Sequence, residues 1–219
     1  MKLSNLKYLR KLVPGTIFIF FGVPCYQYMA GDLLNIDESI GFVIKGYGVV
    51  LAIIIGSFLE CVKIRKLINS KTHQKINNNI KSKLIENGLT ELKTEAEIDA
   101  VKSSKQLMHI FYHLIDNDES LKEKSKLVRD NGLIWTSTID IAIIGCFYSW
   151  LYFILIIFFG ANGLLVSAGL MIGLIGLISG ALLHPRAVSE HIALGDEQID
   201  FIVTNHKNTL QNKITGLFN

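Results

Sequence analysis

Apolar residues are concentrated in four stretches that form two closely spaced pairs. The first pair covers residues 12–31 and 39–59, and the second covers 134–159 and 163–184. Each stretch is long enough to cross the hydrocarbon core of a bilayer as a helix, which takes about 20 apolar residues. The pattern predicts an all-α membrane protein with four transmembrane helices in two hairpins. A mean hydropathy of +0.37, too high for an ordinary soluble domain, agrees with several spans.

The placement of charge orients these spans. The loop 31–38 contains acidic residues but no Lys or Arg, and only Lys45 of the 22 Lys and Arg residues lies outside the predicted cytoplasmic regions and their boundaries. The positive-inside rule therefore predicts a multi-pass inner-membrane protein with cytoplasmic N- and C-termini. Pro185 should end the fourth span, and Asp196–Gly216 has the spacing of an amphipathic helix. The expected parts are a tail and hairpin (1–60), a helical cytoplasmic insert (61–132), a second hairpin (133–185) and a cytoplasmic C-terminal helix (186–219).

Helix ends can be placed within the insert. Its basic first part should continue the second span as a helix into the cytosol. Thr94–Glu97 and Ser120–Glu123 match the capping-box pattern that starts helices, and Gly88 and Gly132 are typical helix ends. The helix that starts at Thr94 has an apolar stripe, which we expect to cover other helices or a neighbouring subunit.

Glycines recur along the fourth span at intervals of four, three and four residues. They are Gly169, Gly173, Gly176 and Gly180. This spacing places them on one face of a helix, where the missing side chains allow close backbone contact inside a bilayer. The face is predicted to pack against another span or against a second copy of the chain, so a homo-oligomer is expected.

Two charged residues lie within or at the edge of the predicted spans. Lys45 is about five residues into the second span, where it either reaches back to the headgroups and nearby acids or lines a polar cavity between helices. Asp140 lies near the inner end of the third span, where a short hairpin brings Arg186 close. An ion pair between Asp140 and Arg186 is expected, and a proton-carrying carboxylate is the alternative.

The start of the insert is rich in cations. We name as the basic collar the residues Lys63, Arg65, Lys66, Lys71 and Lys75. The collar is expected to touch anionic headgroups at the cytoplasmic face. Direct nucleic acid binding is not expected, because no aromatic residue is interleaved for stacking on bases.

Chemistry-bearing motifs are few. His109 and His113 are one helical turn apart with Asp116 after them, which is either the beginning of a metal site or ordinary hydrogen bonding at a helix interface. Because no fourth ligand is evident, no metal is assigned. The chain contains no phosphate-binding loop, nucleophile elbow or metalloprotease helix. We therefore predict no enzymatic activity and no cofactor.

The layout of two hairpins around a cytoplasmic insert resembles the stator proteins of the flagellar-motor and ExbB class. Those families carry Thr and Ser along their last two spans, whereas the last span here offers only Ser167 and Ser179. With four spans, both ends inside and a basic helical insert, the whole chain is similar to KwaA, the small membrane component of the bacterial Kiwa anti-phage defence system. This resemblance implies an inner-membrane homo-oligomer that detects infection at the envelope and holds a soluble DNA-binding partner on its cytoplasmic side.

Three functions follow from these patterns. The first is an oligomeric inner-membrane platform or sensor that recruits or controls a soluble cytoplasmic protein partner in anti-phage defence. The alternatives are a gated ion-permeable pore that depolarises the membrane and a small transporter. The spans contain two clear charges and no polar lining for a constitutive conduit, and the fourth span lacks the polar break typical of transporters. The platform is therefore the function that we expect.

Overall fold

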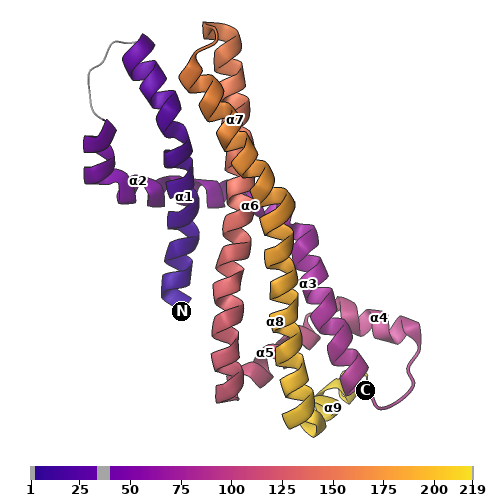
Figure 1. Ribbon diagram of the computed structural model, residues 1–219. Coiled ribbons are helices and arrows are strands. Elements are labelled where there is room, and N and C mark those ends of the chain that lie inside the picture. Colours follow the sequence, from indigo (N-terminus) through magenta and orange to yellow (C-terminus); the bar gives the residue numbers. More distant parts are fainter. Residues whose placement is uncertain (1–2, 34–39, 219) are drawn as a thin grey trace. The chain divides into compact units, whose positions relative to one another are not determined.

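The computed structural model describes residues 3–33 and 40–218, with side chains for residues 4–30 and 46–218. All regular structure in these residues is helical, which confirms the all-α class (Figure 1). In chain order the helices are α1 (Leu3–Gln27), η1 (Tyr28–Leu33), α2 (Ile40–Val62), α3 (Ile64–Gly88), α4 (Glu95–Ser103), α5 (Gln106–Asp116), α6 (Glu119–Phe159), α7 (Gly163–Ile178), η2 (Ser179–Leu183), α8 (His184–Asn205) and α9 (Lys207–Thr215).

The apolar helices are long enough to cross a membrane. Three qualify among the described residues, namely Ser4–Ala30, Glu119–Phe159 and Gly163–Asn205, and a fourth is added if the bent pair of α2 and α3 counts as one span. Length and apolar composition thus support a multi-pass membrane protein.

The chain divides into two compact units. Unit 1 consists of Met1–Asn69 and Leu133–Ala187, and unit 2 consists of Ser70–Gly132 and Val188–Asn219. We had expected divisions after residues 60, 132 and 185. The helices α3, α6 and α8 each continue from one unit into the other. A boundary between apolar and polar sequence therefore need not be a boundary between helices.

In unit 1 the helices α6 and α7 lie side by side (Figure 1), with the glycines Gly169, Gly173, Gly176 and Gly180 against α6. The facing residues on α6 are Ala142, Gly145, Cys146, Ser149 and Tyr152. A Cβ atom added at Gly176 would lie 3.4 Å from the backbone nitrogen of Cys146. Mostly small residues face the glycines, because only small residues on both helices let the backbones approach so closely.

The aromatic residues of α6 pack on α1 instead. Tyr148 and Tyr152 are buried with Phe21, and the Phe18 ring lies 5.1 Å from that of Tyr148. The Tyr152 hydroxyl donates a hydrogen bond to the Phe21 carbonyl of α1. This bond satisfies the one polar group of a side chain that is otherwise fully buried.

Helix α1 crosses α2 at close range (Figure 1). A side chain at Gly15 would collide with the backbone of Ala52, and one at Gly56 would collide with the backbone of Lys11. Pro14, next to Gly15, lies inside α1, which begins at Leu3. The crossing is thus a second place where glycine permits backbone contact.

We had expected the second apolar stretch to continue as one helix into residues 61–132, but α2 ends at Val62 and α3 begins at Ile64. Lys63 has φ 58°, a left-handed conformation that is strained for a side chain other than glycine, and α3 leaves α2 at a bend of 62°. Conformations of this kind cost about 1–3 kcal/mol and persist where the surroundings stabilise them. The ion pair of Arg65, two residues later, is such a stabilising contact.

The single helix predicted from Thr94 is two helices, although its predicted capping box is present. The Ser104 hydroxyl donates to the Val101 carbonyl and accepts from the Gln106 amide, while the Lys81 ammonium donates to the carbonyls of Lys102 and Ser104 at 2.6 and 2.7 Å. These contacts satisfy the backbone groups that a continuous helix would have paired. The break between α4 and α5 is the result.

Two predicted ends of the long helix α6 are wrong. The N-cap is Asp118, whose Oδ1 accepts the Leu121 amide at 3.0 Å, so Ser120 is already in the first turn. Gly132 does not end a helix, since α6 runs through it without a break to Phe159. One glycine inside a helix of 41 residues costs about 1 kcal/mol, which is too little to stop it.

Pro185 does not end a helix either. It is the second residue of α8, and the π-helical turn η2 lies directly before it. In that turn the His184 amide bonds to the Ser179 carbonyl, a wider step that makes room where a proline ring would crowd an α-helix. The amphipathic helix predicted over Asp196–Gly216 begins earlier, at His184, and is interrupted at His206.

Unit 2 has an apolar core of its own. The fully buried side chains in it are Leu84, Leu107, Leu121, Ile199, Ile202, Leu210 and Ile214. Polar contacts join the same helices, because Asp196 on α8 accepts from the Asn79 amide at 2.7 Å and from the Lys83 ammonium at 2.9 Å, both on α3. Residues of the insert and of the C-terminal helices are thus buried in one core, with α5 in contact with α9.

Candidate functional site

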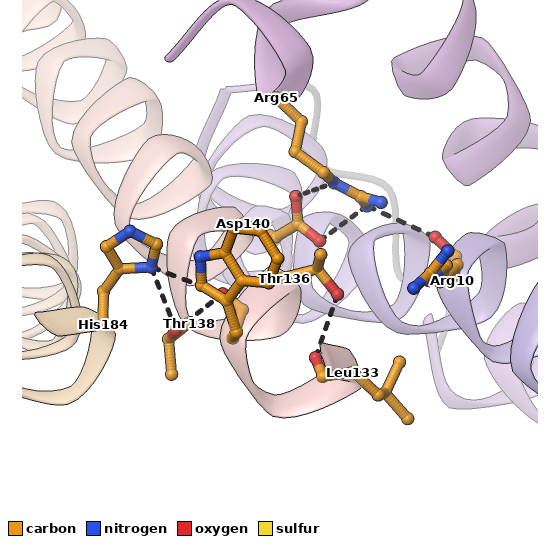
Figure 2. Close-up of polar contacts among 8 residues, drawn as sticks. Arg10, Arg65, Leu133, Thr136, Thr138, Asp140 and His184 are labelled. Atoms are coloured by element: carbon orange, nitrogen blue, oxygen red, sulfur yellow. Dashed lines mark hydrogen bonds and ion pairs between the residues drawn. The ribbon is translucent and has the colours of Figure 1, made fainter. Parts of the chain in front are cut away.

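The polar end of unit 1 is centred on one ion pair. The Arg65 guanidinium donates from Nε to Asp140 Oδ1 at 2.7 Å and from Nη2 to Asp140 Oδ2 at 2.6 Å (Figure 2). The Asp140 side chain is 8% exposed and that of Arg65 is 24% exposed. The pair joins the start of α3 to α6 with two parallel hydrogen bonds, which is the strongest geometry available to these groups.

Arg65 also reaches the first helix. Its Nη2 donates to the Arg10 carbonyl of α1 at 3.3 Å, and the Arg10 side chain lies beside it (Figure 2). The two guanidinium groups are close enough to repel each other. Arg65 is therefore the point at which α1, α3 and α6 are held together.

A second polar group lies at the same end of α6, facing α8. The His184 ring nitrogen Nδ1 lies 3.4 Å from Thr138 Oγ1 and 3.3 Å from the Trp135 carbonyl (Figure 2). The Ser179 hydroxyl donates to the Thr138 carbonyl at 2.8 Å. All four residues are buried. These bonds hold α6 against the π-helical turn before Pro185, so α6 is joined to the following helices by hydrogen bonds as well as by the glycine face.

The expected partner of Asp140 was wrong. Arg186 is exposed on α8, and both oxygens of Asp140 are bound by Arg65 instead. Arg186 had been chosen because it follows the fourth span in the adjacent hairpin. The bend at Lys63 brings Arg65 to the carboxylate, and no periodicity in the sequence indicates that bend.

The other predicted site residues are separate from this pair. Lys45 lies in α2, but its side chain is outside the described residues. Within the basic collar, Lys63 forms the bend, Arg65 is half-buried in the ion pair, and the rest are exposed on α3, namely Lys66, Lys71 and Lys75. The collar is thus divided between one structural arginine and a set of solvated lysines.

The histidine pair on α5 has an exposed position. His109, His113 and Asp116 are all exposed, and the Asn117 amide lies 3.3 Å from His113 Nδ1. Among the described residues, no cluster of three or more His, Cys, Asp or Glu side chains has the arrangement of a metal site.

A signal for the Arg65–Asp140 pair was present in the sequence. Arg65 is the first arginine after the second span, and Asp140 is the first acid in the third. In two hairpins of the same orientation these positions lie at a similar depth, so the pair could have been considered.

Comparisons of the chain with known protein families, curated proteins and solved structures found no match.

Proposed function

We propose that the protein is an oligomeric platform or sensor in the bacterial inner membrane, with both termini in the cytoplasm, and that it recruits or controls a soluble partner protein, in anti-phage defence. The observation that carries this proposal is the continuity of α3, α6 and α8 from unit 1 into unit 2. Because each of these helices belongs to both units, a change in one unit has a continuous route along the chain to the other.

The packing of unit 1 favours this function over a pore within one chain. The residues that meet between α1, α6 and α7 are tyrosines, phenylalanines and aliphatic residues, with Tyr152 and Leu165 fully buried. A water-filled conduit needs a polar lining or a wide hydrophobic gate. In the described residues, the buried polar groups of unit 1 concentrate at one end, around Asp140 and His184.

Unit 2 offers an exposed position for a partner. Of the apolar stripe predicted on the insert, Phe111 and Ile115 are buried, whereas Tyr112 is 54% exposed on α5 beside the exposed His109 and His113. Exposed tyrosine is enriched in protein interfaces because it combines a large apolar ring with a hydroxyl.

Localisation of the protein encoded by the adjacent reading frame tests the proposal. A fluorescent fusion of that protein should be membrane-bound when the full chain is present and cytosolic when it is deleted, and Tyr112→Ser should reduce the membrane-bound fraction. Asp99→Asn, at an exposed position on α4, is the matched control. Sustained, selective current from the purified protein alone in planar bilayers, with no recruitment, would contradict the platform and indicate the pore.

A further inference from the structure

Cations outnumber carboxylates where the inner ends of α1 and α2 meet α3. The side chains there are Lys7, Arg10, Lys11, Lys63, Arg65 and Lys66, opposed by Glu60 and Asp140. The carboxylates are already engaged, since Glu60 pairs with Lys11 at 3.7 Å and Asp140 with Arg65. Positive charge therefore remains uncompensated at this end of unit 1.

Arg10 is the most distinctive of these cations. Among the described residues, no carboxylate lies within ion-pair distance of its guanidinium: Glu60 attracts it from farther away, and the like-charged Arg65 repels it. Asp140 accepts from Nε and Nη2 of Arg65, and Nη1 of Arg65 has no hydrogen-bond acceptor among the described residues. Two guanidinium groups with N–H donors that no described carboxylate accepts thus lie near each other, as Figure 2 shows for Arg10 and Arg65.

We propose that Arg10 and Arg65 together bind the phosphodiester of an anionic phospholipid. Guanidinium groups match the geometry of phosphate oxygens, and an anion between the two arginines would remove their mutual repulsion. The surrounding lysines Lys7, Lys63 and Lys66 are exposed and add attraction toward an anionic membrane surface.

The adjoining surface favours a lipid over other phosphate compounds. The arginines lie where apolar helices begin, because Ser4–Ala30 is long and apolar enough to cross a membrane and Phe20 on it is 70% exposed. A lipid supplies a phosphate at the headgroup level and acyl chains beside such apolar surface. The inference rests on this end of unit 1 lying at a membrane surface, and it does not require the partner protein of the proposed function.

Thermal unfolding of the full-length protein in lipid nanodiscs tests the site. Nanodiscs of phosphatidylcholine that contain 20 mol% phosphatidylglycerol should raise the unfolding temperature above that in phosphatidylcholine alone. Arg10→Gln should abolish most of this gain, and in a titration it should weaken the affinity for phosphatidylglycerol about fivefold. In phosphatidylcholine alone, Arg10→Gln should be as stable as the wild type or more stable, because repulsion from Arg65 is removed. A merely structural role for Arg10 predicts the opposite sign. Lys105→Gln, an exposed lysine of unit 2, is the matched control.

Competing ligands decide the source of the phosphate. An equal gain from inorganic phosphate, or displacement of the lipid by a single-stranded oligonucleotide, would overturn the assignment to a lipid. An equal gain in Arg10→Gln and wild type would overturn the site. If Arg10→Gln does not fold, titration of the wild type at 50 and 500 mM NaCl replaces it, and binding that does not weaken with salt contradicts the proposal.

Discussion

Removal of one partner of the Arg65–Asp140 pair should destabilise unit 1 strongly. Arg65→Met leaves a carboxylate that is only 8% exposed without its two hydrogen bonds. Breaking a buried pair in this way costs about 3–5 kcal/mol. Because Arg65 is 24% exposed, water can partly replace it, and we expect about 3 kcal/mol, near the lower end of that range. Asp140→Leu should cost about 2 kcal/mol, because it leaves a partly solvated guanidinium.

A double-mutant cycle measures the coupling between the two residues. The variant with both Arg65→Met and Asp140→Leu buries no unpaired charge, so it should lose no more than about 1 kcal/mol of unfolding free energy. The interaction energy, which is the sum of the two single costs less the cost of the double variant, should therefore be about 4 kcal/mol in reversible unfolding of the micelle-bound protein. Arg186→Met, at the exposed position first expected to pair with Asp140, should change stability by less than about 0.5 kcal/mol. Single effects that add to the double effect within about 0.5 kcal/mol would refute the ion-pair argument.

Three further outcomes are expected. Gly176→Leu forces a side chain into the backbone of α6 and should cost at least about 2 kcal/mol or prevent folding, whereas Leu177→Ala, at a position 64% exposed, should change unfolding much less; equal effects would place the glycine face against lipid. The pKa of Asp118 is lowered by the backbone amide at the start of α6 and by the His206 ring, so its contribution to stability is present above about pH 4 and is lost as the pH falls through its lower folded pKa. The free energy of unfolding, measured from pH 7 to 3, should fall less steeply with pH in Asp118→Asn than in the wild type. Equal slopes in the two proteins would contradict this role. Reporters fused to either terminus should be cytoplasmic and one at Asp37 external, and a cytoplasmic signal at Asp37 would contradict the charge argument.

The sequence by itself determined the all-helical class, the apolar helices and the glycine face. These follow from properties of single continuous stretches of sequence, namely the length of each apolar run and the spacing of the small residues within it. The capping box at Thr94 and the helix end at Gly88 were also predictable, because each depends on neighbours within one turn. Local rules succeeded where the backbone groups concerned have local partners.

Only the tertiary structure decided the partner of Asp140 and the continuity of the long helices. Arg65 meets Asp140 because the chain bends at Lys63, and a lysine carries no local signal for a left-handed conformation. Gly132 and Pro185 are local helix breakers, but Gly132 lies inside α6 and Pro185 is the second residue of α8. The penalty at such a residue is about 1–3 kcal/mol, and the packing of two helices against each other exceeds it. Which weak local preference is overridden therefore depends on contacts between residues far apart in the chain.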